Sequence, residues 1–449
     1  YSSDVEQHFL ELAQTFHQAY LDRLKATGEE DFDGLLQQAV ASVTLGETVF
    51  RRKSGTGDLK NLRYILIDEY QDFSKLFNRL IEAIREQNPQ AQFFCVGDDW
   101  QAINGFAGSD LLFYKDFSQF FQPSRKLTIS TNYRSAISVV NLSNLLMQGL
   151  GTPARAYKTM PGVIDIVDLS AFEPTPKEIE NHQGDRLTPA ILRLVNKAIY
   201  DGKDVVMLSR KNSLPWHVNY GNRQITSRQG TLDNFLELVR SHLPEKHREN
   251  VSISTAHKYK GLEKKVVILL DAVPKCYPLL HSDMIFTQIF GDNIERIVDE
   301  ERRLFYVALT RAVEHLFIIT KANNLSPFLE YLQSKTTLCF LNWFDYLPLI
   351  GEIKHITVKI RNQIDRGSEG TFNIRTLLKA QGFVWNSQAK IWWRTYLAQN
   401  FSIETFFHSS EWCNCAHGIE IQFDDELETM IAMYRIDNGQ PSCIINNLL

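Results

Sequence analysis

Short, wholly apolar runs separated by segments of helical periodicity constrain the fold of this chain more than any other feature. Residues 64–67 (Tyr-Ile-Leu-Ile) and 93–96 (Phe-Phe-Cys-Val) are such runs, and they are typical of parallel strands buried on both faces. Between them, apolar residues recur at helical spacing over residues 77–84. A strand, a helix and a strand at this spacing predict a βαβ unit and therefore an α/β fold.

Further segments along the chain have the character of strands, and they predict a second parallel-sheet domain. We expect its strands over residues 126–130, 205–208, 251–254, 266–270 and 316–320. Helices are expected between them, for example over residues 191–200 and 300–310, and before the first strand over residues 1 to about 50.

The composition is that of an ordinary globular protein, with 44% hydrophobic and 22% charged residues among 449. The net charge of −5 excludes a protein held to nucleic acid by its overall field, so any such contact must come from a local groove. Cysteines are widely scattered, no apolar stretch reaches the ~18 residues of a membrane span, and no secretory signal opens the chain. We therefore expect a cytoplasmic protein with no membrane partner. Tyr1 falls straight into a helical pattern, which indicates a fragment whose beginning is missing.

Two adjacent carboxylates follow the first predicted strand. Ligands of open parallel sheets sit beyond the carboxyl ends of the strands, and Asp68 and Glu69 stand at that position. One carboxylate could hold Mg²⁺ while the next orients and deprotonates an attacking water, as phosphoryl transfer requires. The alternative is a solvated pair that caps the following helix.

A glutamine follows the second predicted strand, in the run Gly97-Asp98-Asp99-Trp100-Gln101. Such a glutamine can hydrogen-bond a phosphate oxygen and so report whether the phosphate is present. The alternative, which this run by itself favours, is a turn built from glycine and aspartate.

Together these runs resemble motifs of a known family. Asp-Glu-x-x-Asp at residues 68–72 and Gly-Asp-x-x-Gln at residues 97–101 resemble motifs II and III of the UvrD/Rep family of superfamily-1 helicases. Further segments follow in the family's order: residues 132–135 are similar to motif IV, 254–263 to motif V, and 300–312 to motif VI. Residues 31–36 resemble the segment that leads into motif II. The run at residues 97–101, with its Trp100, resembles motif III of the helicase IV-like branch. The resemblance implies two RecA-like parallel-sheet domains, of which the first is incomplete here.

The resemblance implies that ATP and Mg²⁺ are the cofactors and assigns catalytic roles to the first domain. Asp68 would hold Mg²⁺, Glu69 would be the general base, and Gln101 would contact the γ-phosphate. These roles are physically reasonable, because catalysis of phosphoryl transfer is mostly positioning and charge stabilisation.

The resemblance also assigns residues of the second domain to the nucleotide. Arg134 and Arg311 would complete the γ-phosphate site, and Glu263 would contact the ribose. Arginine suits this task because its planar fork is always charged. The alternative for either arginine is a surface salt bridge.

For nucleic acid, the family suggests phosphate contacts from Thr255 and His257 and base stacking on an aromatic residue after motif III, which here is Phe106. Lys258 would add a cation to this groove. The alternatives are that Phe106 belongs to the core and that Lys258 lies on a solvated face. The implied partners are single-stranded DNA or junctions of single and double strands, with RNA polymerase or repair proteins as further candidates.

The sequence also departs from the family's pattern. No Gly-x-x-x-x-Gly-Lys-Ser/Thr phosphate loop occurs in it, which leaves half of an ATP site. Asn104 and Ala107 replace an aromatic residue and an arginine that relatives usually carry in motif III. Only residues 213–249 separate the strand near residue 205 from motif V, so the duplex-engaging insertion of the family must be largely reduced.

We therefore predict three domains. Residues 1–124 would be the remnant of the first RecA-like domain with a helical subdomain, residues 125–350 the second RecA-like domain, and residues 351–449 a small accessory α+β domain. In the last domain we expect a strand over residues 357–360, a helix over 371–381 and a hairpin over 383–393. Its interleaved Trp, Phe, Lys and Arg suit either a stacking platform or a plain aromatic core. The Cys-x-Cys-x-His run at residues 413–417 hints at zinc, but this spacing disfavours it.

The function predicted from the sequence is an ATP-dependent 3′–5′ DNA helicase or translocase of UvrD/Rep type, with DNA repair as a candidate setting. The first alternative is a catalytically inactive protein that keeps the fold to bind nucleic acid or RNA polymerase. A helicase–nuclease is disfavoured, because no Asp…Glu-x-Lys cluster is evident near the end of the chain.

Overall fold

The computed structural model describes the chain apart from residues 1–2, 54, 183–184, 214–231, 271, 281–292, 347, 349–354, 364–369, 426–427 and 447–449. It divides into two compact units. The first comprises residues 1–133, 140–157 and 274–308, and the second comprises residues 134–139, 158–273 and 309–449. The three-domain division with boundaries after residues 124 and 350 stays a prediction.

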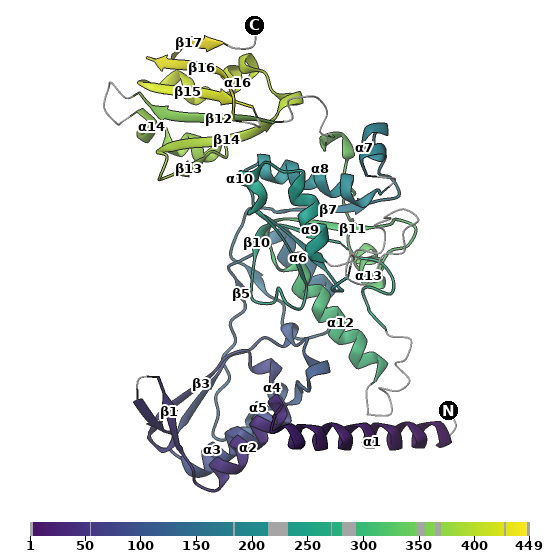
Figure 1. Cartoon of the computed structure of the whole chain (residues 1–449). Coiled ribbons are helices and arrows are strands. Elements are labelled where there is room, and N and C mark those ends of the chain that lie inside the picture. The colour runs from purple at the N-terminus through teal and green to yellow at the C-terminus, as the bar shows by residue number, and fades with distance from the viewer. Residues whose placement is uncertain are drawn as a thin grey trace. The chain divides into compact units, whose positions relative to one another are not determined.

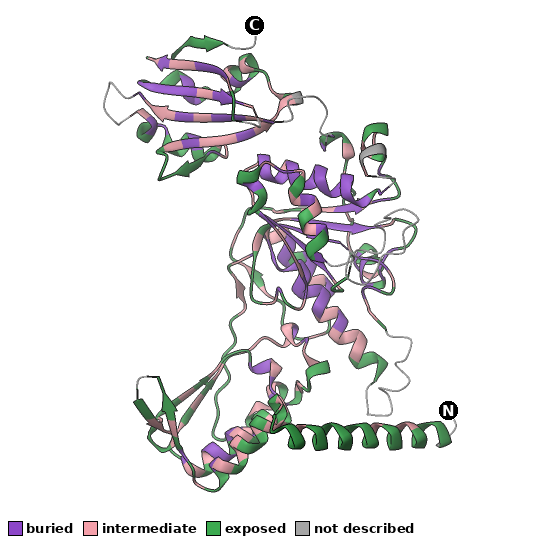
Figure 2. Ribbon diagram, in the orientation of Figure 1, coloured by how far each residue is buried: buried purple, intermediate pink, exposed green. Residues whose placement is uncertain are grey.

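The first unit opens with helices, as the sequence predicts. These are α1 (Ser3–Thr27) and α2 (Phe32–Thr44), followed by a hairpin of β1 (Val49–Arg52) and β2 (Gly55–Asp58). Asp31 caps α2, because its side chain accepts the N–H of Gly34. Most of α1 is exposed, as its green ribbon shows (Figure 2).

The predicted βαβ unit is confirmed. β3 (Tyr64–Ile67) and β4 (Gln92–Cys95) pair in parallel, and α3 (Lys75–Gln87) connects them. Ser74 caps α3 by accepting the N–H of Phe77. The inner face of this two-stranded sheet packs against the core of the unit.

Burial of these strands on both faces, however, is wrong for the described chain. Leu66 and Phe94 lie side by side in the register of β3 and β4 and are 74% and 59% exposed. Parallel sheets normally have both faces covered. Within the first unit, the described residues leave this face of the sheet exposed.

The second unit contains a five-stranded, all-parallel sheet, of which Figure 1 labels β7, β10 and β11. Its strand order is β7-β11-β10-β8-β9. Its strands are β7 (Val163–Asp168), β8 (Val205–Ser209), β9 (Val251–Thr255), β10 (Lys264–Leu269) and β11 (Ala312–Thr320). Its helices include α8 (Leu187–Tyr200), α9 (Leu232–Ser241), α10 (Glu245–Arg248) and α13 (Pro327–Lys335). Four of the five predicted strands are confirmed, and the α/β fold class with them.

The predicted strand over residues 126–130 is wrong, and β7 was missed. Leu127 and Ile129 are exposed, so the apolar character of that segment does not reflect burial in a sheet. Only the short β5 (Thr131–Asn132) follows it, paired with β6 (Arg155–Ala156). The part of the predicted reduced insertion at residues 214–231 lies outside the described residues.

The C-terminal part of the second unit is a six-stranded antiparallel sheet in the order β13-β14-β12-β15-β16-β17. Its strands are β12 (His355–Asn362), β13 (Val384–Asn386), β14 (Ile391–Leu397), β15 (Ile419–Asp424), β16 (Met430–Asp437) and β17 (Gln440–Asn446). Short helices accompany it: α14 (Gly370–Asn373), α15 (Arg375–Ala380) and α16 (Ile403–Ser409). The predicted hairpin is the β13–β14 pair, and Trp392 belongs to an aromatic core with Phe406, Trp412 and Phe423.

No helix in the described parts of the chain has the length and apolarity needed to span a lipid bilayer.

Candidate nucleotide and nucleic-acid sites

The carboxylates Asp68 and Glu69 stand at the carboxyl end of β3, as expected from the sequence. Both are exposed, and the Asp68 Oδ1 atom accepts the N–H of Glu69 at 2.9 Å. Glu69 has a φ of 51°, in the left-handed region that a residue with a Cβ seldom adopts. Such backbone strain persists only where neighbouring contacts hold it, and it is concentrated at functional sites.

A buried glutamine provides those contacts. The Gln71 Nε2 atom donates to Glu69 Oε2 at 2.5 Å, while Gln71 Oε1 accepts the N–H of Asp98 at 2.9 Å. Asp98 follows β4, so one side chain joins the ends of the two strands. Gln71 occupies an unassigned position of the Asp-Glu-x-x-Asp run, and the sequence pattern gives it no role; the only signal in the sequence is an amide side chain within a run of carboxylates.

The run after β4 forms a tight turn that carries Gln101. Asp98 accepts the N–H of Trp100 at 3.0 Å and the Gln101 Nε2–H at 2.6 Å. Trp100 is buried, with its ring edge against Tyr306 at a centroid distance of 5.2 Å. Tyr306 belongs to α12 (Ile294–Leu309), the helix of motif VI. Asp98 thus orients Gln101 within a turn that Trp100 anchors.

Phe106 is 79% exposed, so the alternative in which it belongs to the core is wrong. It sits in a turn that long-range hydrogen bonds hold from both sides. Asn104 Nδ2 donates to Asp72 Oδ2 at 2.9 Å, and the N–H of Gly105 donates to Glu300 Oε1 on α12, also at 2.9 Å. Burial raises the pKa of Glu300. The aromatic ring is therefore presented on a fixed turn.

In the second unit, Arg134 and Glu263 form a salt bridge with an Nε–Oε2 distance of 2.7 Å. The Lys158 ammonium also donates to the carbonyl oxygen of Arg134 at 2.5 Å. The structure therefore brings together two of the residues assigned to the nucleotide, one from motif IV and one from motif V.

Arg311 lies directly before β11 and is 1% exposed, so the alternative in which it forms a surface salt bridge is wrong. Its Nη1 donates to the carbonyl oxygen of Leu262 at 3.2 Å, and its Nη2 donates to Thr310 Oγ1 at 3.2 Å. The first of these hydrogen bonds ties the end of motif VI to motif V, next to Glu263.

The motif V residues assigned to nucleic acid lie at the end of β9 and directly after it. Thr255 is the last residue of that strand, and its hydroxyl accepts the N–H of Lys258 at 3.3 Å. Lys258 is exposed, whereas His257 is partly buried. Burial and then the nearby positive charge of Arg210 lower the pKa of His257 to about 4, so its imidazole is neutral at pH 7.

Among the described residues, no group of three or more His, Cys, Asp or Glu side chains is arranged to hold a metal ion on its own. Burial raises the pKa of Cys413 to about 12, which keeps that thiol protonated.

Two models of known protein families match this chain, one in its N-terminal part and one in its central part. The sequence model of the UvrD/REP helicase N-terminal domain matches residues 2–122, and that of the UvrD-like helicase C-terminal domain matches residues 169–323. The chain belongs to the UvrD/Rep helicase family. Nine of the ten residues singled out above for nucleotide or nucleic acid fall within these two matched segments, and Arg134 lies between them.

Individual relatives of this family are similar over parts of the chain. DNA helicase IV of Escherichia coli is 26% identical over 334 residues, which cover 74% of this chain and 43% of the relative. The ATP-dependent DNA helicase Rep of Escherichia coli is 28% identical over 43% of this chain and 27% of the relative. The chain thus spans less than half the length of these relatives. A crystal structure of the C-terminal domain of a possible DNA helicase from Lactobacillus plantarum matches with a TM-score of 0.25 and 14% identity, over 45% of this chain and 94% of that one.

Proposed function

We propose that this chain works as part of an ATP- and Mg²⁺-dependent DNA helicase or translocase that moves 3′ to 5′ on single strands. The observation that carries the proposal is the pair of Gln71 hydrogen bonds, which fixes Glu69 in a strained conformation and joins it to the turn of Gln101. That arrangement uses a buried side chain to orient an exposed carboxylate, which a merely solvated acidic pair would not need.

In this proposal Asp68 holds Mg²⁺, directly or through water, and Glu69 orients and deprotonates the attacking water. Both carboxylates are exposed, so a cation and a water molecule can reach them. Mg²⁺ prefers oxygen ligands and neutralises charge on the phosphoryl oxygens when bound. Gln101, turned by Asp98, hydrogen-bonds the γ-phosphate.

From the second unit, Arg134 and Arg311 stabilise the phosphoryl oxygens, and Glu263 contacts the ribose. Arg134 and Glu263 are already paired, which keeps both side chains extended toward one another. The hydrogen bonds of Arg311 to Leu262 and Thr310 fix the direction of its guanidinium group. Fixed cations suit this chemistry, since preorganised charges need no rearrangement during the reaction.

The phosphate loop is the missing element of this site. Because the 449 residues contain no such motif, we propose that this stretch of chain alone hydrolyses ATP at or near background. A catalytically inactive nucleic-acid- or RNA-polymerase-binding protein is the second candidate.

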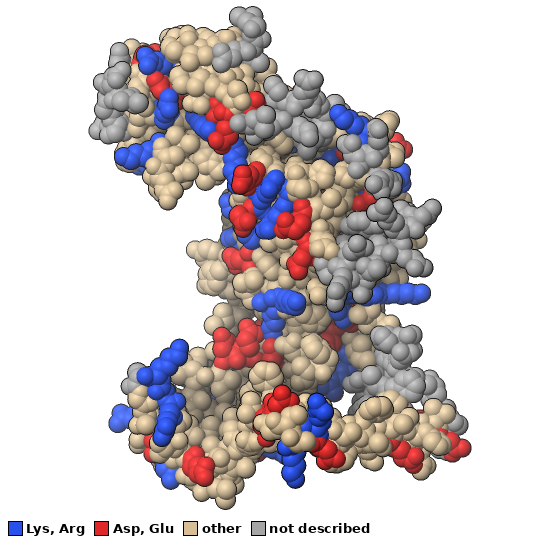
Figure 3. All heavy atoms as spheres, in the orientation of Figure 1, with Lys and Arg blue, Asp and Glu red and all other residues tan. Residues whose placement is uncertain are grey.

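For DNA, we propose that Phe106 stacks on a base while Thr255, His257 and Lys258 contact phosphates. The exposure of Phe106 and of Lys258 supports these roles. Positive and negative side chains are interspersed over the face of the molecule shown in Figure 3, in keeping with the net charge of −5. Binding must therefore come from local contacts such as these, with single-stranded DNA or a strand junction as the partner and a repair protein or RNA polymerase as further candidates.

The test compares Glu69→Gln with the wild type in the natural full-length protein. DNA-stimulated ATP hydrolysis should disappear while binding of single-stranded DNA is kept, because the substitution removes the base without moving Phe106. ATP turnover equal to the wild type would refute the assignment of Glu69, and no turnover in the wild-type protein would support the inactive binding protein.

A further inference from the structure

A cleft of about 580 Å³ opens between the parallel-sheet part of the second unit and its antiparallel-sheet part. The turn from α8 to β8, with Gly202 and Lys203, forms one wall together with Lys265. The end of α15 and the adjoining β13 and β14 form the other wall, with Lys379 and Arg394. None of these residues belongs to a helicase motif.

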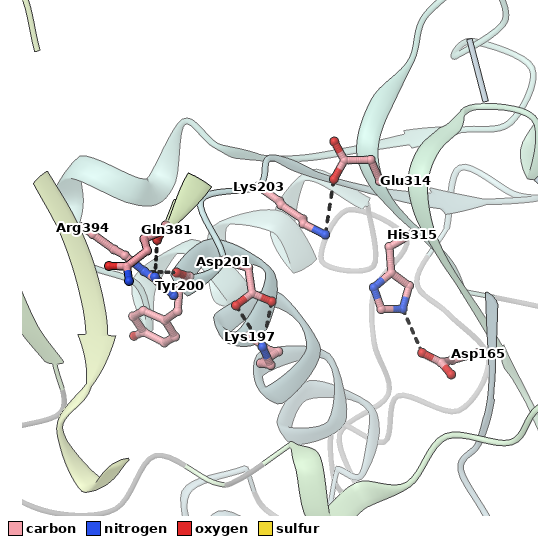
Figure 4. Close-up of polar contacts among 9 residues, drawn as sticks. All are labelled: Asp165, Lys197, Tyr200, Asp201, Lys203, Glu314, His315, Gln381 and Arg394. Carbon is pink, nitrogen blue, oxygen red and sulfur yellow. Dashed lines mark hydrogen bonds and ion pairs between the residues drawn. The ribbon is translucent and has the colours of Figure 1, made fainter. Parts of the chain in front are cut away.

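The walls of this cleft are held together by specific contacts. The Arg394 Nε atom donates to the carbonyl oxygen of Tyr200 at 3.2 Å, and its Nη1 donates to that of Gln381, as Figure 4 shows. The His247 imidazole and the Thr395 hydroxyl form a further hydrogen bond of 3.0 Å. The cleft is therefore formed before any ligand arrives, which lowers the entropic cost of binding.

Close backbone packing sets the width of the cleft at its base. Gly202 has a φ of +68°, and a Cβ on it would lie 3.0 Å from the carbonyl oxygen of Gly382. A glycine there satisfies both requirements, because it adopts the left-handed region freely and leaves room for the opposite chain.

The lining of the cleft carries an excess of positive charge. Four cations, Lys203, Lys265, Lys379 and Arg394, face two carboxylates, Asp201 and Glu314. Both carboxylates are already ion-paired (Figure 4): Asp201 with Lys197 at 2.7 Å, and Glu314 with Lys203 at 3.3 Å.

Two of the cations remain exposed for a ligand. Lys265 and Lys379 stand on opposite walls, and both side chains are exposed. An open cleft with cations on both walls suits a linear polyanion better than a small molecule, which needs an enclosed, mostly apolar cavity.

We propose that this cleft binds the phosphodiester backbone of single-stranded DNA, as a second binding region outside the helicase motifs. The proposal rests on the proposed action on DNA, but it uses none of the residues assigned there. It also gives the antiparallel-sheet part a role, because that part supplies one wall of the site.

The experiment measures binding of a fluorescent oligodeoxythymidine to the 449-residue chain across a range of salt concentrations. Lys265→Gln and Lys379→Gln are tested singly and together. For single strands the slope of log K against log salt becomes shallower by ~0.7 for each phosphate that the protein no longer neutralises, so the double variant should differ from the wild type by ~1.4. Lys335→Gln is the matched control, because Lys335 is an exposed lysine on α13 that does not line the cleft.

Two further variants separate charge from structure and this proposal from the proposed function. Lys265→Arg with Lys379→Arg should keep the wild-type slope, since the positive charges remain. Phe106→Ala should weaken binding in the wild type and in the double Gln variant alike, because the two regions are independent.

A double Gln variant with the wild-type affinity and slope would overturn the cleft proposal, even if Phe106→Ala weakens binding. The same would follow from a slope change of equal size in the Lys335→Gln control, or from an effect confined to duplex DNA. If the cleft variants weaken binding while Phe106→Ala does not, the cleft stands and the stacking role fails.

Discussion

We predict that breaking the hydrogen bond between Gly105 and Glu300 lowers both the melting temperature and the DNA affinity that Phe106 provides. A Cβ on residue 105 would lie 2.3 Å from Glu300 Oε2 and 3.0 Å from its carboxyl carbon. Gly105 does not have a positive φ, so alanine fits the backbone there and the conflict is with the carboxylate alone. Gly105→Ala should therefore displace the carboxylate and break the 2.9 Å hydrogen bond, without straining the main chain.

The expected cost follows from the nature of this bond. A hydrogen bond to a charged group contributes about 1.5–3 kcal/mol to stability, and a displaced, buried carboxylate would not regain it from water. For a folding unit of 150–250 residues, each kcal/mol lowers the melting temperature by about 2–4 °C. Without the hydrogen bond to Glu300, the turn should hold the Phe106 ring in a less fixed position. The binding free energy for DNA should then fall by at most the ~1–3 kcal/mol that stacking of one base contributes.

The assay measures melting temperature and oligodeoxythymidine affinity on the same variants. Glu300→Gln is the matched control, because its amide oxygen can still accept the N–H of Gly105 and should keep both values near those of the wild type. Glu300→Ala should behave like Gly105→Ala. In the Phe106→Ala background, neither substitution should weaken DNA binding further.

Two outcomes would refute this reasoning. Wild-type melting temperature and affinity in Gly105→Ala would show that the hydrogen bond does not hold the turn. A decrease in affinity in Glu300→Ala that is equally large without the Phe106 ring would show that Glu300 acts by another route.

Three further predictions test the site and the domain contacts. In the natural full-length protein, Arg311→Ala should lower kcat by on the order of 10³–10⁵ and leave single-strand binding nearly intact; wild-type turnover would exclude Arg311 from the γ-phosphate site. The 449-residue chain should show background ATP hydrolysis that Glu69→Gln leaves unchanged, whereas DNA-stimulated turnover sensitive to that substitution would contradict it. Burial and, second, the positive charge of Lys246 lower the pKa of His247 from 6.5 to about 4. Between pH 6.5 and about pH 4 the unfolded chain therefore binds more protons at this residue than the folded chain does. Stability from this group is thus complete above pH 6.5 and declines as the pH falls toward 4, by at most about 3 kcal/mol, and His247→Gln should flatten that part of a melting-temperature profile.

The sequence predicted the central fold because burial and periodicity are local signals. The runs that form β8, β10 and β11 are largely continuous and apolar, the run of β9 alternates Val and Ile with Ser, and together they form a sheet covered by helices. The same rule misassigned residues 126–130, where apolar side chains are exposed, and missed β7, whose run Val-Ile-Asp-Ile-Val-Asp contains two charges. A strand at the edge of a sheet tolerates such charges, as the Asp165–His315 contact of 2.8 Å to β11 shows.

The candidate site was predictable in its residue types but not in the hydrogen bonds that connect them. Motif spacing singled out Glu69, Gln101 and Phe106, because each stands in, or shortly after, a motif that follows a predicted strand. It gave no sign that Gln71 joins two strand ends, since that contact depends on how β3 and β4 pair. Nor could spacing place Glu300 against Gly105, because 195 residues separate the two.

Helix α12 shows why such contacts matter for interpreting mutations. Its residue Glu300 holds the turn of Phe106, its residue Tyr306 packs against Trp100, and two residues beyond its end stands Arg311. A substitution at Gly105 therefore acts on a side chain of the same helix whose Tyr306 packs against Trp100. DNA affinity and melting temperature must both be measured for such a variant, because a lower affinity by itself would not show whether the turn of Phe106 or the contact with Trp100 was disturbed.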